Sequence, residues 1–230
     1  MAVVSRAPEP LVLVGSGGFG RETAEVVRAI NAAAAPDSPR WQLLGFLDDD
    51  ERRWGKPVSG TPVIGGIDEV HALPDAAVVV CTGHPRCFTS KKRIVGRLGL
   101  GPERYATLVH PAAVVPPSCA LGGGTVVLAG VVATADVRVG AHVGLMPHVV
   151  LTHDDRLEDY VTAGAGVRVA GAVHVREGAY LGSGCMIREG VTVGPWALVG
   201  MGAVVTRDVP GGEVWSGVPA RFARPVASTP

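Results

Sequence analysis

Two short stretches hold residues that could take part in catalysis or in ligand binding. The first lies in the second half of the chain. In Leu151-Thr-His-Asp-Asp155, four consecutive polar residues interrupt a region that is otherwise mostly small or apolar. Histidine titrates near neutral pH, so an imidazole is a natural general base for an attacking amine or hydroxyl. A neighbouring carboxylate can fix the tautomer of that imidazole and stabilise its protonated form. His153 followed by Asp154 is therefore a candidate base with its support, the alternative being a histidine with a structural role only.

The other stretch is glycine-rich and lies near the start of the chain. Gly15, Gly17 and Gly20 satisfy the pattern G-x-G-x-x-G, directly after an apolar strand at 11–14 and before a helical stretch from 21 to about 32. Strand, glycine-rich turn and helix form the opening of a nucleotide-binding βαβ unit, in which backbone N–H groups at a helix N-terminus face a phosphate. The motif alone is a weak signal, and a tight βα turn without a ligand is the alternative.

The elements after this turn predict a small parallel sheet. A strand at 41–47 ends in Asp48, Asp49 and Asp50, at the place where Rossmann-like folds read a ribose or base, although a solvated turn fits equally well. Further strands are predicted at 61–64 and 77–81, with a small helix at 67–72 between them. A helix from about 85 to 98 carries five Lys or Arg residues, which we interpret as a solvated face. Three or four strands suit one mononucleotide better than a dinucleotide.

The second half of the chain has a period of six. From Val109 to Val205 every sixth residue is aliphatic or Ala, and 15 of these 17 positions are Val, Leu or Ile. This period fits neither a helix nor an ordinary strand, whereas hexapeptide repeats are a signature of a parallel β-helix. Three hexapeptides complete one coil, and the residue two before each aliphatic also points inward. The repeat therefore predicts a triangular coil of 18 residues.

The coil places Gly171, which follows His153 by 18 residues, next to that histidine. Its bare backbone N–H can approach a substrate oxygen closely. Other histidines compete with His153 for the role of base. They are His110, His142, His148 and His174, of which His148 and His174 occupy outward repeat positions without an adjacent carboxylate.

The composition narrows the classes of partner. The formal net charge is zero, so there is no bulk attraction to nucleic acid or to an anionic membrane. The four cysteines show no C-x-x-C spacing, and neither a metal site nor a disulfide is predicted. The first residues lack the form of a signal peptide, and no apolar run reaches 18 residues. These features predict a soluble, cytoplasmic protein.

Together, a glycine-rich βαβ module, the run "LVHPAAVV" at 108–115, the unbroken repeat and "GVPAR" at 217–221 resemble one family. This family is the sugar acyltransferases of the sialic-acid O-acetyltransferase type, which include the enzymes that N-acetylate UDP-linked 4-amino sugars during bacillosamine synthesis. The resemblance covers about residues 11–224, and the segments 14–21, 45–49 and 151–154 carry it.

The resemblance implies a fold, partners and site residues. It implies an α/β N-terminal Rossmann-like module at 1–107, followed at 108–230 by an all-β left-handed parallel β-helix with a C-terminal tail. It implies a homotrimer that holds acetyl-CoA between subunits and a nucleotide-linked sugar, expected to be a UDP-linked amino sugar, in the N-terminal module. Its catalytic His and acidic residue match His153 and Asp154, and its oxyanion-binding glycine amide matches Gly171. The acetyl-CoA positions are Thr162, Gly171, Ser183, Met201 and Arg221, and the sugar-nucleotide positions are Gly15, Gly17, Gly18, Phe19, Asp48, Asp49 and Gly83.

The chain departs from the family at two positions. Phe19 stands where many members have a histidine in the glycine-rich turn, and Thr162 stands where many have a second histidine. The leading hypothesis is an acetyl-CoA-dependent N-acyltransferase acting on an amino group of a nucleotide-linked sugar, by direct attack with His153 as base. The alternatives are a sugar O-acetyltransferase and a non-catalytic trimer that binds a nucleotide sugar. A dinucleotide oxidoreductase is disfavoured because no second domain offers hydride-transfer chemistry.

Overall fold

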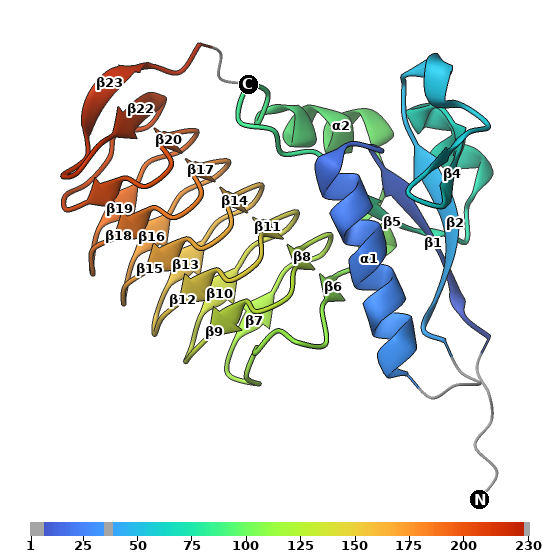
Figure 1. Cartoon of the computed structure of the whole chain (residues 1–230), viewed down its shortest axis with the longest axis horizontal. Helices are drawn as coiled ribbons and strands as arrows, with labels where there is room; N and C mark the ends of the chain where they lie inside the picture. Colours follow the sequence, from blue (N-terminus) through green and yellow to red (C-terminus); the bar gives the residue numbers. More distant parts are fainter. Residues whose placement is uncertain (1–6, 35–38, 228–230) are drawn as a thin grey trace, which may run out of the picture.

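The computed structural model describes residues 7–34 and 39–227, which form an α/β domain and a β-helix (Figure 1). The predicted domain limits at the two chain ends, and the last three residues of the predicted tail, lie outside the described residues. Within them, no helix is long and apolar enough to cross a membrane.

The α/β domain is built on a five-stranded sheet with the order β3-β4-β2-β1-β5. The strands β1 (Glu9–Val14), β2 (Trp41–Leu47), β4 (Thr61–Gly65) and β5 (Ala77–Val80) run parallel, and β3 (Pro57–Val58) pairs antiparallel with β4. The predicted parallel strands are thus confirmed. The first and second strands have apolar runs because helices or the β-helix cover them on both sides.

The helices differ slightly from the predicted ones. The helix α1 (Gly18–Ala33) begins inside the glycine-rich turn, and α2 (Ser90–Leu98) begins later than predicted because residues 84–89 form successive tight turns. Three short 3-10 helices complete the domain, η1 (Glu51–Arg53), η2 (Ile67–Ala72) and η3 (Pro102–Arg104).

The β-helix begins at β6 (Leu108–Val109) and consists of short strands separated by tight turns. Its two-residue strands are β7 (Ala120–Leu121), β8 (Val126–Val127), β9 (Val132–Ala133), β10 (Arg138–Val139), β11 (Gly144–Leu145), β12 (Val150–Leu151), β13 (Arg156–Leu157), β14 (Thr162–Ala163), β15 (Arg168–Val169), β16 (His174–Val175), β17 (Tyr180–Leu181), β18 (Met186–Ile187), β19 (Thr192–Val193), β20 (Leu198–Val199) and β21 (Val204–Val205). A longer hairpin of β22 (Glu213–Ser216) and β23 (Arg221–Pro225) closes the end.

Paired residues in neighbouring coils are 18 apart, as the repeat predicts; Leu145, for example, pairs with Ala163. Three parallel stacks result, consistent with the left-handed β-helix that the resemblance implies (Figure 1). Both inward positions of each hexapeptide form one buried core, which includes Val137, Val173 and Cys185. The prism owes its stability to burial of these side chains from neighbouring coils.

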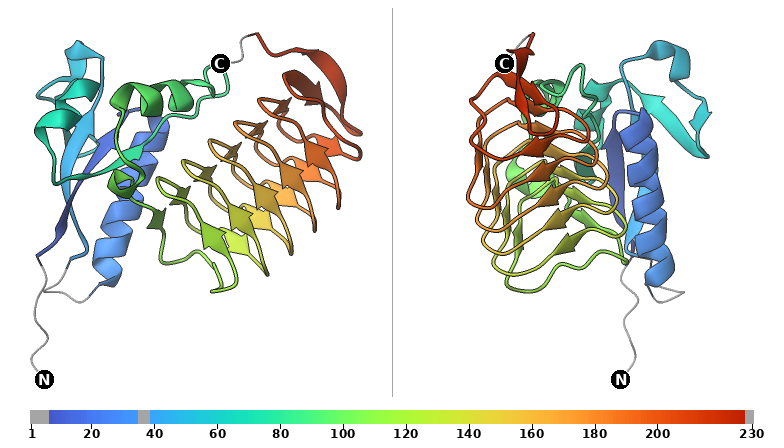
Figure 2. Two further views of the ribbon diagram at one scale, coloured as in Figure 1. Left: turned by 180° about the vertical axis from the view of Figure 1, so that it is seen from behind. Right: turned by 60° about the vertical axis from the view of Figure 1, so that its left-hand side comes forward.

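The three faces of the prism differ in their outward residues. The docked face, made by β6, β8, β11, β14, β17, β20, β22 and β23, carries the α/β domain (Figure 2). The polar face, made by β7, β10, β13, β16 and β19, presents Arg138, Arg156 and His174. The apolar face, made by β9, β12, β15, β18 and β21, presents the valines 114, 132, 150 and 204 together with Arg168 and Met186. Its Val114 and Met186 are 55% and 48% exposed.

The helix α2 fastens the α/β domain to the β-helix, and this corrects one prediction. Lys91 is buried, and its Nζ donates to the carbonyl oxygen of His142 at 2.8 Å. The Nζ of Lys92 lies 2.8 Å from the Glu177 carboxylate. The interpretation of this basic run as a solvated face is therefore wrong for Lys91, which the docking of the two domains buries, whereas the Lys92 side chain stays 44% exposed.

Candidate active site

His153 and Asp154 lie together in the turn between β12 and β13, where the apolar and polar faces meet. We call this edge of the prism the His153 edge. The His153 Nδ1 lies 2.9 Å from Asp154 Oδ2, and both side chains are about two thirds exposed, at 66% and 64%. This contact uses Nδ1, so Nε2 is the ring nitrogen left to exchange a proton with a substrate.

Gly171 lies directly beside the His153 ring, as the 18-residue coil predicts. A Cβ added to this glycine would be 2.4 Å from His153 Cε1 and 2.5 Å from Nε2, so only a glycine leaves room for the imidazole. The turns are also joined by the backbone, because the Ala172 N–H donates to the His153 carbonyl oxygen at 2.9 Å. The Gly171 N–H itself donates no hydrogen bond to any residue that the structure describes. A free N–H next to an imidazole suits the stabilisation of an oxyanion.

The other residues predicted to bind acetyl-CoA lie away from the His153 edge within one chain. Ser183 and Met201 lie at the edge between the docked and apolar faces, and Met201 is 80% exposed. Arg221 is at the start of β23, and its guanidinium donates to the Ala220 carbonyl. Thr162 is buried on the docked face. Together with Gly171, these positions therefore lie on two edges and on the docked face of the prism.

A cavity of about 470 Å³ lies between the glycine-rich turn and the docked face. Six of the seven residues predicted for the sugar nucleotide line it: Gly15, Gly17, Gly18, Phe19, Asp48 and Gly83. The β-helix contributes Met146 to its wall. Phe19 also packs against the β-helix, since a Cβ on Gly144 would be 3.2 Å from its Cζ. The cavity thus lies at the junction of the two domains.

Asp48 organises the entrance to this cavity. Its Oδ2 accepts hydrogen bonds from Ser16 N and Ser16 Oγ at 2.8 and 2.5 Å, and its Oδ1 accepts from Asp50 N at 2.9 Å. Burial alone would raise the pKa of Asp48, but these hydrogen bonds and the nearby Arg53 charge outweigh it and lower the pKa below its ordinary value. The carboxylate therefore stays charged and fixes the glycine-rich turn.

Ser16 and Arg53 are functional candidates that sequence reasoning missed. Arg53 Nη1 donates a hydrogen bond to Ser16 Oγ at 2.8 Å, and Arg53 lines the cavity. Arg53 lies in η1, a segment with no apolar periodicity. The hydrophobic pattern of the sequence therefore could not predict that Arg53 reaches the cavity. The signal available was a serine inside the glycine-rich motif itself.

Asp49 is the one predicted sugar-nucleotide residue outside the cavity lining. Its Oδ2 lies 2.6 Å from Arg97 Nη1, and its Oδ1 accepts from Ile67 N at 3.1 Å. Successive residues at the end of a strand point to opposite sides, so Asp48 faces the cavity while Asp49 ties β2 to η2 and α2.

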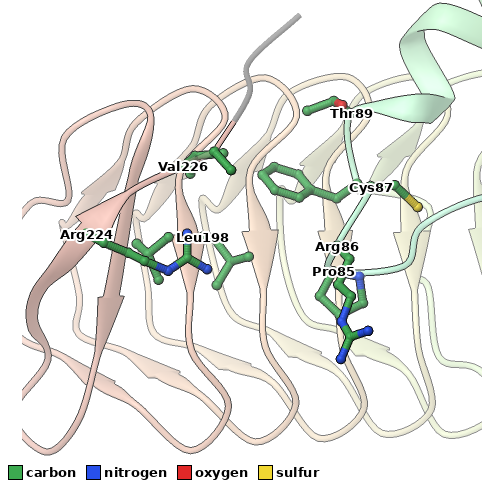
Figure 3. Close-up of a pocket in the computed structure, with 10 residues that line it drawn as sticks. Pro85, Arg86, Cys87, Thr89, Leu198, Arg224 and Val226 are labelled. Carbon is green, nitrogen blue, oxygen red and sulfur yellow. The ribbon is translucent and has the colours of Figure 1, made fainter.

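A second cavity, of about 280 Å³, lies on the other side of the turns at 85–89. Arg224 extends toward Leu198 on one side of it, and Pro85, Arg86 and Cys87 form the opposite wall (Figure 3). None of the residues predicted for the site lines this cavity.

The cavity at the glycine-rich turn and the His153 edge do not meet within one chain. The cavity opens against the docked face, whereas His153 lies at the edge opposite that face. Thr162 is the predicted acetyl-CoA residue nearest the cavity, because a Cβ on Gly83 would be 3.4 Å from its Oγ1. A substrate held in the cavity of one chain would thus need a second chain to supply His153.

Comparisons with known proteins agree with this architecture. The model of the PglD N-terminal domain matches residues 10–93. The chain is 31% identical over 121 residues to the UDP-N-acetylbacillosamine N-acetyltransferase of Bacillus subtilis (strain 168). That match covers 52% of this chain and spans about half the length of the relative, 51%.

Solved structures extend the similarity to nearly the whole chain. The acetyltransferase domain of PglB from Neisseria gonorrhoeae FA1090, in complex with acetyl coenzyme A, superposes with a TM-score of 0.82 at 27% identity, covering 94% of this chain and 100% of that one. PerB from Caulobacter crescentus, in complex with CoA and GDP-perosamine, gives 0.80 at 30% identity, covering 93% and 97%.

The α/β domain, the hexapeptide β-helix and these similarities together place the chain in a class of sugar acyltransferases. The chain belongs to the PglD-type hexapeptide-repeat sugar N-acetyltransferase family.

Proposed function

We propose that this protein transfers the acetyl group of acetyl-CoA to an amino group on a nucleotide-linked sugar, with His153 as general base. One observation carries the proposal: the His153 ring, with Asp154 on its Nδ1, lies against Gly171, whose N–H donates to no residue that the structure describes. Family membership and the acetyl-CoA or CoA in the two solved structures support acetyl-CoA as the acetyl donor. The name of the Bacillus subtilis relative and the GDP-perosamine bound to PerB support a UDP- or GDP-linked amino sugar as acceptor.

The side chains divide the reaction between them. As the amine forms its bond to the thioester carbon, His153 Nε2 accepts the proton that the nitrogen loses. The Gly171 N–H donates to the carbonyl oxygen as that oxygen gains charge. When the carbon–sulfur bond breaks, the imidazolium returns the proton to the CoA sulfur. Asp154 holds the tautomer with the proton on Nδ1 and stabilises the imidazolium in between.

The cavity at the glycine-rich turn is the proposed site of the nucleotide. The N-terminus of α1 offers backbone N–H groups to a phosphate, and Arg53 adds a positive charge at the same entrance. Asp48 holds Ser16 and Arg53 in place, which leaves the nucleobase and sugar to occupy the space between Phe19 and Met146.

A homotrimer would complete the active site. Since the cavity and the His153 edge lie on different sides of one chain, a second copy is needed to bring them together. The apolar face supports this arrangement, because it leaves large apolar side chains, Val114 and Met186, about half exposed. Contact through this face would place the His153 edge of one copy and the Ser183 edge of another at a shared groove for acetyl-CoA.

The test is a pair of variants assayed with acetyl-CoA, a panel of UDP- and GDP-linked amino sugars and a thiol-detecting reagent. His153→Ala should lower kcat by about 10²–10⁴-fold and leave KM for acetyl-CoA nearly unchanged. Asp154→Asn should have a smaller effect, because the base remains. His148→Ala is the matched control, since His148 occupies another turn of the β-helix. The proposal fails if His153→Ala keeps the wild-type kcat, or if the control loses more.

A further inference from the structure

One charged residue lies inside the core of the β-helix. The inward column that contains positions 119, 137, 155, 173 and 191 holds Cys, Val, Asp, Val and Val, and Asp155 is fully buried there. A buried carboxylate costs free energy unless hydrogen bonds compensate for the lost water. Because Val fills the same place in neighbouring coils, folding alone does not require an aspartate at this position.

Both carboxylate oxygens of Asp155 hold backbone N–H groups near the proposed active site. Oδ2 accepts from Thr152 N at 2.8 Å, and Oδ1 accepts from Val173 N at 3.0 Å. Thr152 directly precedes His153, and Val173 follows Gly171 by two residues. The carboxylate therefore joins the turn that carries the imidazole to the turn that carries the N–H donor.

This link is additional to the regular bonds of the coil. Backbone bonds already join three successive pairs of turns along this edge: Asp154 N donates to Ala135 O, Ala172 N to His153 O and Gly190 N to Gly171 O. Only the coil that holds His153 has an inward carboxylate as well, among the residues that the structure describes. The Asp155 link thus lies where the distance between the His153 turn and the Gly171 turn would set the geometry of the proposed reaction.

We propose that Asp155 is a positioning residue that holds the His153 imidazole at a fixed place relative to the Gly171 N–H. The inference rests on the proposed function of His153. Asp155 does not reach the reacting atoms, because it is buried in the core and its oxygens are taken by Thr152 and Val173. Its contribution is geometric: a misplacement of about 1 Å can cost about 10²-fold in rate.

The test variant is Asp155→Val, which introduces the residue found at 137 and 173 and should fold. We expect kcat to fall about tenfold or more, while KM for acetyl-CoA changes less than about twofold. Thr125→Val is the matched control: Thr125 is also inward and buried, and its Oγ1 bonds Gly140 O and Val143 N in a coil without His153. This control should keep the wild-type kcat. A wild-type kcat in Asp155→Val would overturn the proposal.

A double-mutant cycle separates positioning from a general structural role. In the His153→Ala background, Asp155→Val should lower kcat by less than about twofold, because there is no base left to position. An equal loss in both backgrounds would overturn the proposal while leaving the role of His153 intact. If His153→Ala itself is fully active, the proposed function fails instead, so the two failures are distinguishable.

Hydrogen exchange gives a readout that needs no substrate. Loss of the link should speed amide exchange at 152–154 and 171–173 in Asp155→Val, with no change at the other edges of the prism. Asp155→Asn keeps the shape but only one acceptor oxygen, so it should show the same change to a smaller extent and serves if the Val variant does not fold. Unchanged exchange in the variant that folds would overturn the proposal.

Discussion

At the scale of single residues, the contact between His153 and Gly171 is the most informative feature of the molecule. It joins two residues 18 apart in sequence, and the added-Cβ distance of 2.4 Å leaves no room for a larger residue at 171 while the imidazole keeps its position. Gly171 does not have a positive φ, so its selection follows from this close approach and not from backbone strain.

Gly171→Ala should therefore displace the imidazole without unfolding the chain. We expect kcat to fall about 10²-fold, because the ring must move away from both the substrate and Asp154. Thermal unfolding and steady-state kinetics measured together check this. Gly96→Ala in α2, where an added methyl meets nothing within 4 Å, is the control and should leave kcat unchanged. A displaced transition temperature with a normal kcat would contradict the prediction.

The buried Asp155 should make stability depend on pH. Burial raises the pKa of Asp155 to about 7, although hydrogen bonds from the Val173 and Thr152 N–H groups favour the charged form. The folded state then binds a proton between about pH 4 and 7 that the unfolded state releases, so this group favours folding less as the pH rises through that window.

Asp155→Val should remove this dependence. Above pH 7 the variant should be the more stable protein, and its advantage should shrink on acidification by at most about 1.4 kcal/mol per pH unit. Urea unfolding of both proteins from pH 8 to 5 measures the difference. An advantage that grows as the pH falls would mean that the carboxyl is stabilised in its charged form. A variant that is more stable yet less active would show that the buried charge serves activity.

At the scale of secondary-structure elements, the two adjacent carboxylates at the end of β2 point to opposite sides and make different contacts. Asp48 holds Ser16 and Arg53 at the cavity, while Asp49 pairs with Arg97 outside it. The sequence alone could not separate them, because both follow the same strand.

Asp48→Ala should weaken nucleotide binding, whereas Asp49→Ala should not. Loss of a charged acceptor from the glycine-rich turn should raise the Kd for UDP or GDP about tenfold or more. Isothermal titration calorimetry with each nucleotide measures this, and Asp49→Ala, as the matched control, should stay within about twofold. Equal weakening by both variants would place the nucleotide elsewhere.

The secondary-structure elements also show which features a local sequence pattern can predict. The period of six is set by neighbours in sequence and in the adjacent coil, so it predicted the β-helix and the pairing of His153 with Gly171. The burial of Lys91 and the place of Arg53 depend on how separate elements dock. No periodicity encodes such contacts, and the interpretation of the basic run as a solvated face therefore failed at Lys91.

At the scale of the whole molecule, the prism has one face that leaves large apolar side chains exposed in the single chain. The docked face carries the α/β domain and the polar face carries charges, but the apolar face exposes Val114 and Met186. Large exposed apolar patches mark association surfaces, which agrees with the proposed trimer.

Met186→Glu should break up the proposed trimer by placing a charge on the apolar face. Light scattering at micromolar concentration should give three times the chain mass for the wild type and a smaller species for the variant. Arg138→Glu on the polar face is the control and should leave the mass unchanged. Activity should fall with the trimer, since the cavity and His153 would then be supplied by separate molecules. A wild type that is monomeric and fully active would contradict the shared site.

The strict pairing of residues 18 apart also governs which changes in length the protein tolerates. Inserting one residue within a coil would shift every later residue by one position relative to its pairing partner. Inward side chains would then point outward, which would expose valines and bury arginines. Adding or removing a whole coil between β17 and the closing hairpin would preserve every pairing and leave the His153 and Gly171 turns unchanged. The natural unit of variation for this half of the molecule is therefore a complete coil, and its length is expected to change in steps of that unit.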